Sequence, residues 1–310
     1  MKYTHTIAAQ SLVVLLASMP GLAGELPDIK PVPRDLEVPA MREAPPAPGL
    51  RVKVVAPAYR NTDVYHSLYL PTDWRKGGKY PVIVEYAGNG PYSNKYGDTC
   101  SGKIEDCNLG YGISGGKGVI WVCLPYISAD HKRNQLQWWG DVEATADYCK
   151  TLLPRICAEY GGDPARLFLA GFSRGSIACN FIGLHDDGIA KLWRGFICHS
   201  HYDGVKTWNY AGSDSASAAA RLARLKDRPQ FISHEGSVAV TRQYLEQACP
   251  GGNFRFEALP YRNHTDAWVL RDLPARKAVR AWFADLTAGS RQQEGQRSPA
   301  GEVPKAAPGQ

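Results

Sequence analysis

The sequence predicts an α/β fold with a mostly parallel, twisted sheet of eight strands and helices on both faces. Two early segments, 51–55 and 64–70, alternate apolar and polar residues as half-buried strands do. Two later runs, 80–86 and 119–124, are continuously apolar, which is typical of central strands covered on both faces. Strand and helix patterns then alternate along the chain, and this alternation favours parallel pairing.

The remaining elements follow in order. A helix is expected over 138–160, with a kink or break at Pro154, because proline has no backbone N–H to donate. A short buried strand at 165–170 and an apolar helix at 176–184 come next. Further strands are expected at 194–198, 229–234 and 254–259, and further helices at 215–225, 238–248 and 265–286.

The ends of the chain differ in composition from its middle. Residues 1–23 combine Lys2, a short apolar stretch and a small residue at Ala23, so we expect a secretory signal cleaved after Ala23, with a buried N-terminal helix as the alternative. Residues 24–49 contain seven prolines and are expected to form an extended linker outside the core. One large domain should occupy 50–288, and the polar residues 289–310 should be disordered. The mature protein should therefore be secreted or periplasmic.

The eight cysteines suit an oxidising compartment. Cys100 and Cys107 flank a polar loop and could close it as a disulfide, whereas Cys123 and Cys198 lie in apolar runs typical of buried free thiols. No Cys-x-x-Cys pair exists, which argues against a zinc ribbon. The net charge of +6 includes no basic block, so no nucleic-acid partner is expected. No membrane partner is expected after signal cleavage, because no other segment is apolar for long enough to span a bilayer.

The most informative motif is Gly171-Phe172-Ser173-Arg174-Gly175, which lies between the expected strand at 165–170 and the helix that follows. A Gly-x-Ser-x-Gly sequence in this context indicates a nucleophile elbow, a sharp turn that exposes the serine hydroxyl. The alternative is an ordinary Gly/Ser loop. We interpret Ser173 as a catalytic nucleophile that needs a nearby base.

The order of elements, the elbow after the fifth strand and a histidine after the eighth resemble the α/β-hydrolase superfamily over about residues 50–288. The signature at 163–175 is similar to that of secreted esterases and of polymer-ester depolymerase-like members. The resemblance implies an α/β-hydrolase fold with the chain order nucleophile, acid, histidine. His264, in a polar turn after the last strand, fits the general base, and a surface or capping histidine is the alternative.

The acid has two candidates. Glu235 is the only carboxylate in the turn after the seventh strand, and 29 residues separate it from His264, enough for one helix and one strand. Asp203 follows the sixth strand, where some hydrolases carry the acid. We favour Glu235 and keep Asp203 as the alternative acid; either carboxylate could instead cap a helix or face solvent.

The oxyanion hole should be formed by two backbone N–H groups, one from Arg174 and one from the turn after the third strand, where Asn89 is preferred over Gly90. Candidate substrate-binding residues lie near the same edge, where their rings could stack on sugar rings or aromatic acyl groups or could belong to the core. They are Tyr92, Trp139, Tyr202 and Trp208. The segment 203–214 is too short for a helical lid, which favours an open site for a bulky ester.

The sequence therefore predicts an exported serine esterase that hydrolyses a carboxylic ester, carbohydrate-linked or polymer-linked, through an acyl-enzyme intermediate. Alternatives are a serine peptidase or amidase of the same fold and a catalytically inactive sugar-binding protein. His199 and His201 lack a nearby ligand cluster, so no metal is expected, and the proposed chemistry needs no organic cofactor. The expected partner is a small-molecule or polysaccharide ester.

Overall fold

The computed structural model describes residues 25–295, so the expected signal at 1–23 and residues 296–310 lie outside the described part. Nine strands form one sheet in the order β1-β2-β3-β7-β4-β8-β9-β10-β11. β2 pairs antiparallel with β3, and β3 with β7, whereas all other neighbours are parallel. The strands are β1 (Met41–Arg42), β2 (Arg51–Val54), β3 (His66–Tyr69), β4 (Tyr80–Tyr86), β7 (Ile120–Leu124), β8 (Gly162–Phe172), β9 (Gly195–His199), β10 (Gln230–Glu235) and β11 (Phe254–Leu259).

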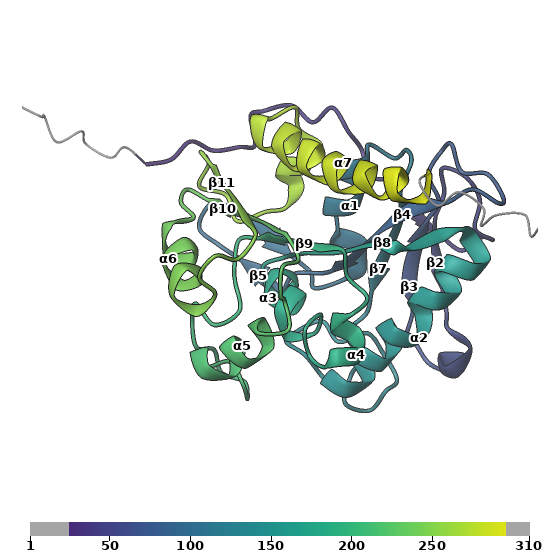
Figure 1. The fold of residues 1–310 in the computed structure, drawn as a ribbon, viewed down its shortest axis with the longest axis horizontal. Helices are drawn as coiled ribbons and strands as arrows, with labels where there is room; N and C mark the ends of the chain where they lie inside the picture. Colours follow the sequence, from purple (N-terminus) through teal and green to yellow (C-terminus); the bar gives the residue numbers. More distant parts are fainter. Residues whose placement is uncertain (1–24, 296–310) are drawn as a thin grey trace, which may run out of the picture.

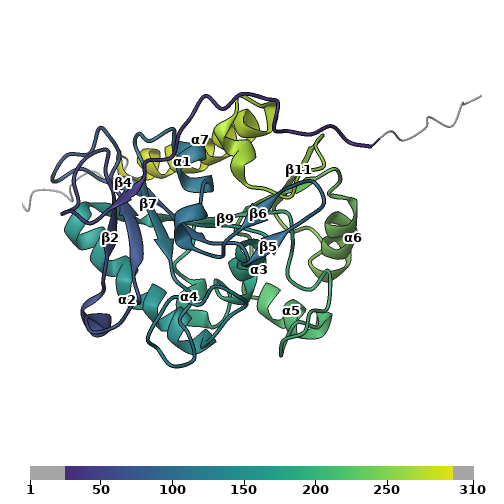
Figure 2. The ribbon, with the colours of Figure 1, turned by 180° about the vertical axis from the view of Figure 1, so that it is seen from behind.

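Helices cover both faces of the sheet (Figures 1 and 2). One face packs against α2 (Val142–Tyr160), α3 (Arg174–Phe181), α4 (Asp187–Ala190), α5 (Ser215–Leu222) and α6 (Ala239–Ala248). The other face packs against α1 (Leu109–Ser114), α7 (Pro274–Gly295) and the 3-10 turn η3 (Ala267–Leu270). Two further 3-10 turns, η1 (Pro57–Tyr59) and η2 (Ile104–Asp106), and a small ribbon of β5 (Tyr92–Ser93) and β6 (Thr99–Cys100) complete the chain. The expected mostly parallel α/β sheet is confirmed, with one strand more than the eight predicted.

Two helices differ from their predicted extents for local reasons. α2 begins at Val142 rather than near residue 138, because Trp138 (φ 51°) and Gly140 (φ 64°) adopt left-handed backbone conformations that a helix excludes. The helix then runs through Pro154 without ending there. The last predicted helix is divided into η3 and α7, and α7 starts at Pro274, where proline is well tolerated in a first turn.

The proline-rich segment is extended, as expected, but it is not a free linker. Its side chain Ile29 is only 2% exposed and packs into the core beneath α7. Asp35 accepts hydrogen bonds of 2.7 and 2.6 Å from Arg276 of α7. Met41–Arg42 form β1, the one strand of the nine-stranded sheet that the sequence did not predict. At the other end, α7 continues to Gly295, beyond residue 289, where the disordered tail was expected to begin.

All eight cysteines lie in the described residues, and all are free thiols. The expected disulfide between Cys100 and Cys107 is therefore absent. The Cys107 thiol lies instead beside Cys123 and Glu85, with the three potential ligand atoms within 4.8 Å of one another. Among the described helices, none has both the length and the apolar character that a membrane span needs.

Candidate active site

Ser173 occupies a sharp turn between β8 and α3. Its backbone is left-handed (φ 55°, ψ −115°), a conformation that is strained for a residue with a side chain. The flanking glycines make the turn possible. A Cβ on Gly171 would lie 2.1 Å from the backbone of Gly175, and one on Gly175 would lie 2.0 Å from the carbonyl oxygen of Tyr86 in β4. The motif therefore has the geometry of the nucleophile elbow that the sequence predicted.

The structure brings Ser173, His264 and Glu235 together. His264 lies in the loop after β11, and its Nε2 is 3.1 Å from the Ser173 Oγ. Its Nδ1 is 2.7 Å from Oε1 of Glu235, the last residue of β10. The three residues lie at or beyond the carboxyl ends of the parallel strands β8, β10 and β11. In this arrangement the imidazole can accept the serine proton while the carboxylate orients the ring and stabilises its cation.

The charges around His264 favour this role. Burial opposes the ionisation of Glu235, but the hydrogen bond from His264 and the neighbouring imidazoles outweigh it and lower the pKa of this carboxyl to about 2. Burial also lowers the pKa of both His199 and His201 to about 4. Glu235 is thus an anion at neutral pH, and the two flanking imidazoles are neutral.

Ser200 belongs to the same cluster, although no sequence pattern distinguished it. Its Oγ lies 2.8 Å from Glu235 Oε1 and 2.7 Å from His264 Nδ1. The residue follows β9 with φ 84°, and its N–H donates to the Ser233 carbonyl at 2.8 Å. The hydroxyl can therefore donate to the carboxylate while it accepts from the imidazole N–H.

The alternative acid, Asp203, has another partner. Its buried carboxylate accepts two hydrogen bonds from Arg221, at 2.8 and 3.0 Å. It makes no hydrogen bond to His264 among the described residues. A bidentate pair of this kind binds the loop after β9 to α5, which is a structural role.

The side chains of the two expected oxyanion residues, Arg174 and Asn89, both form hydrogen bonds with the backbone of Trp138. The N–H groups of Arg174 and Asn89 donate no hydrogen bond within residues 25–295, whereas Gly90 N–H donates to Leu136 O at 3.0 Å. Asn89 Oδ1 accepts from Trp138 N at 2.7 Å. The Arg174 guanidinium donates to the Trp138 carbonyl at 2.5 Å and to the Gly88 carbonyl at 2.8 Å. Gly90 is therefore less suited than Asn89 to be the second donor.

A cavity of about 410 Å³ opens beside Ser173. Of the four expected substrate-binding residues, Tyr92 and Trp208 line it. Trp139 and Tyr202 do not, since Trp139 stacks on Phe181 in the core and the Tyr202 hydroxyl donates to Gln230 at 2.6 Å. The expectation for these two residues was wrong, because an aromatic near the sheet edge can point into the core. Other lining residues are Asn94, Trp138, Ile177, His201 and Arg262.

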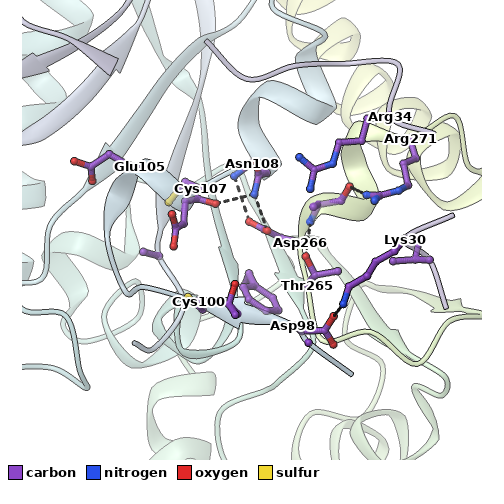
Figure 3. A pocket seen from close by; sticks show the side chains of 18 residues that line it. Lys30, Arg34, Asp98, Cys100, Glu105, Cys107, Asn108, Thr265, Asp266 and Arg271 are labelled. Carbon is purple, nitrogen blue, oxygen red and sulfur yellow. Dashed lines mark hydrogen bonds and ion pairs between the residues drawn. The ribbon is translucent and has the colours of Figure 1, made fainter. Parts of the chain in front are cut away.

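A second, more polar cavity of about 370 Å³ is lined by Asp98 and by Thr265 and Asp266, the two residues that follow His264 (Figure 3). Asp98, between β5 and β6, accepts a hydrogen bond from the His264 N–H at 2.9 Å and one from Asn263 Nδ2 at 2.8 Å. Lys30 of the N-terminal segment lies 3.9 Å from the same carboxylate. The loop between β5 and β6 therefore holds the backbone of His264 in place.

The group of Glu85, Cys107 and Cys123 could hold a metal by distance alone, but its surroundings do not suit a cation. The Glu85 oxygens already accept from the N–H groups of Asn108, Leu109 and Gly110 and from Trp121 Nε1, at 2.8 to 3.1 Å. Arg51 Nη2 also lies 3.5 Å from Cys123 Sγ. This carboxylate therefore satisfies the first N–H groups of α1.

Solved structures share this architecture. An acetyl ester-xyloside bifunctional hydrolase from Caldicellulosiruptor lactoaceticus superposes with a TM-score of 0.53 at 15% identity, covering 79% of this chain and 99% of the other. Esterase 2 of Thermogutta terrifontis, phosphorylated by paraoxon, gives 0.52 at 16% identity, covering 84% and 100%. A thermostable esterase gives 0.47 at 14% identity, and the chain, of which 76% is covered, spans 62% of its length. No protein-family model and no curated protein matches the sequence.

At these identities the likeness concerns the fold. The nine-stranded sheet, its helices on both faces and the superposed structures show that this chain has the α/β-hydrolase fold. The resemblance inferred from the elbow and the order of elements is confirmed at that level.

Proposed function

We propose that the protein is an exported serine esterase that hydrolyses a carbohydrate-linked or polymer-linked carboxylic ester through an acyl-enzyme intermediate. One observation carries the proposal: a continuous line of hydrogen bonds runs from Ser173 Oγ through His264 to Glu235, and the serine sits on a strained elbow. Together with the α/β-hydrolase fold, this geometry is what an acyl-transfer site requires.

The reaction uses only groups of the chain and water. His264 Nε2 takes the Ser173 proton as Oγ attacks the ester carbonyl, and the Arg174 and Asn89 N–H groups stabilise the oxyanion. The imidazolium then protonates the leaving alcohol, so that the C–O bond breaks and the acyl-enzyme remains. A water molecule gives its proton to His264 and attacks the acyl carbonyl. When this second intermediate collapses, the imidazolium returns the proton to Ser173 and the acid is released.

The decisive experiment removes the Ser173 hydroxyl group. Ser173→Ala should lower kcat by several orders of magnitude without changing the circular dichroism spectrum, because the variant lacks the hydroxyl that would accept the acyl group. A fluorophosphonate should label Ser173 in the native protein and nothing in the variant, as mapped by peptide mass. Ser176→Ala, three residues further along α3, is the matched control and should keep the label. Ester turnover by Ser173→Ala would sink the proposal, and peptide amides assayed in parallel would test amidase activity.

Export is the second part of the proposal, supported by the basic start and short apolar stretch within residues 1–23. Protein recovered from an exporting host should begin at or near Gly24 by intact mass. An unprocessed Met1 terminus would contradict the export part and would leave the esterase part untouched.

A further inference from the structure

Trp138 is held in an unfavourable backbone conformation at the edge of the catalytic cavity. Its φ of 51° is left-handed, which is rare for a bulky residue and costs free energy unless the surroundings compensate. Two side chains hold it there, Asn89 at its N–H and Arg174 at its carbonyl. These are the two residues whose backbone N–H groups form the proposed oxyanion hole.

The Arg174 side chain is well placed to enforce this conformation. It is 1% exposed and lies over the Tyr126 ring at 3.9 Å, and it donates to the Gly88 carbonyl in the oxyanion turn as well as to Trp138. Burial lowers its pKa, but the carbonyl oxygens around it still stabilise a cation. The Arg174 guanidinium thereby connects Trp138, which lines the cavity, to the turn after β4 that carries Asn89.

Aromatic residues line the cavity both near His264 and near the proposed oxyanion residues. Tyr92 packs edge-on against the His264 ring, with centroids 5.2 Å apart. The alcohol must leave at this end, because His264 protonates it. The Trp138 backbone is hydrogen-bonded to the side chains of Asn89 and Arg174, and its ring lies 5.3 Å from the Trp208 ring. This attachment to the proposed oxyanion residues favours the side of the carbonyl and its acyl substituent for the two rings.

Most polar side chains that line the cavity are already engaged. Asn94 accepts from the N–H groups of Tyr96 and Asp98, Arg262 pairs with Asp28 and Glu25, and Glu235 is hydrogen-bonded to His264. A sugar ring needs several hydrogen-bond partners, whereas a flat apolar group needs mainly contact area. An acetyl group would fill little of a cavity of about 410 Å³.

We propose that Trp138, with Trp208 beside it, forms the acyl-binding subsite of this enzyme and that the acyl group it takes is a planar aromatic one. The inference rests on the esterase activity proposed above and adds the substrate class. Trp138 is then a specificity-determining residue whose strained backbone positions its ring beside the scissile carbonyl.

Two esters that carry the same aromatic ring on opposite sides of the ester bond test this assignment. Methyl cinnamate carries its ring on the acyl side and cinnamyl acetate carries it on the alcohol side, so the ratio of their kcat/KM values reports the acyl subsite. Trp138→Gly keeps the left-handed backbone without strain and removes only the ring. It should lower the ratio by about 10-fold or more, because a large aromatic contact is lost. Trp138→Phe should restore part of it, and Tyr92→Ala should change it in the opposite direction.

Trp74→Ala removes a half-buried tryptophan that does not line the cavity, and it should leave the ratio at the wild-type value. Equal losses of kcat/KM for both esters in Trp138→Gly, or a larger loss for cinnamyl acetate, would overturn the assignment. A wild-type kcat/KM that is higher for acetylated sugars than for methyl cinnamate would also overturn it.

Calorimetric titration of methyl cinnamate into Ser173→Ala and into Ser173→Ala/Trp138→Gly separates the two proposals. Weaker binding to the double variant supports the subsite even if Ser173→Ala retains turnover and the esterase mechanism fails. Equal binding overturns the subsite and leaves the mechanism intact.

Discussion

Glu235 meets His264 through one oxygen, Oε1, while its buried Oε2 has no hydrogen-bond partner among the described residues. Glu235→Gln keeps the size of the side chain but removes the charge that stabilises the imidazolium. We expect kcat to fall by roughly 10²–10⁴ with little change in stability, as for amide replacement of a triad acid. Steady-state kinetics with a p-nitrophenyl ester would measure this.

Asp203→Asn gives the complementary result. It should change kcat far less and lower the melting temperature more, because Arg221 would lose the anion that its largely buried guanidinium pairs with. The reverse kinetic ranking would transfer the acid to the loop after β9.

Ser200 should also contribute to activity. Its hydroxyl bonds to Glu235 Oε1 and His264 Nδ1, so it both restrains the carboxylate and shares its charge. Ser200→Ala should lower kcat/KM by about 10-fold, which corresponds to one hydrogen bond to a charged group.

The positive φ of Ser200 calls for a second variant, Ser200→Gly, which relieves the backbone strain and still lacks the hydroxyl. If Ser200→Gly recovers the wild-type kcat/KM, the hydroxyl has no positioning role.

The sequence could predict Ser173, His264 and Glu235 as neighbours, because chain order and strand ends place such residues on one sheet edge. Ser200 and Trp138 could not be found in this way. Their roles depend on left-handed backbone conformations and on partners 35 to 64 residues away for Ser200 and 36 to 49 for Trp138. Neither feature leaves a local pattern.

At the scale of elements, the contact between α3 and β4 positions the proposed oxyanion hole. Gly175 in the first turn of α3 approaches Tyr86 O so closely that a Cβ would lie 2.0 Å away. Gly175→Ala should therefore separate α3 from the turn that carries Asn89, with loss of activity and a marked loss in the free energy of unfolding measured with urea.

Gly118→Ala is the matched control for that variant. Its Cβ would meet nothing within 4 Å, so only its left-handed φ of 67° is penalised, by about 1–2 kcal/mol. Equal destabilisation of the two variants would argue against a role for close approach at Gly175.

Element boundaries were predicted less well where the hydrophobic periodicity and the capping residue disagreed. Asp141 caps α2 by accepting from Ala144 N at 2.9 Å, yet the pattern alone placed the helix start several residues earlier. The ninth strand, β1, is two residues long and lies among prolines, so no periodic signal marks it. Such short elements are defined by their tertiary partner rather than by their own residues.

At the scale of the whole molecule, segments remote in sequence converge on the histidine loop. Ile29 N donates to Asn263 Oδ1 at 2.8 Å, and Asp98, between β5 and β6, accepts a hydrogen bond from the N–H of the next residue, His264. Composition alone predicted a linker at 24–49, because proline content indicates extended backbone but not what that backbone packs against. The N-terminal segment is thus part of the support of the site.

Stability of the whole chain should depend on two buried carboxyl groups beneath this loop. Burial raises the pKa of Asp266 to about 8, with a further contribution from the Glu85 charge, and burial also raises the pKa of Glu85. Glu85 has four N–H donors, whereas Asp266 accepts only from the N–H and Nδ2 of Asn108 (Figure 3). We therefore expect Asp266, rather than Glu85, to be the protonated carboxyl group at neutral pH.

The folded protein then binds a proton at Asp266 that the unfolded chain has released, so the contribution of this group to stability is greatest below its ordinary pKa of 3.8 and is lost as the pH rises through about 8. Asp266→Asn cannot ionise. Its free energy of unfolding relative to wild type should therefore rise steadily between about pH 4 and pH 8 in urea titrations. Asp285→Asn, at an exposed site on α7, is the control for the loss of a surface carboxyl group. A difference for Asp266→Asn that stays constant with pH would mean that Asp266 is ionised in the folded protein and that the Asn108 amide groups suffice to hold its charge.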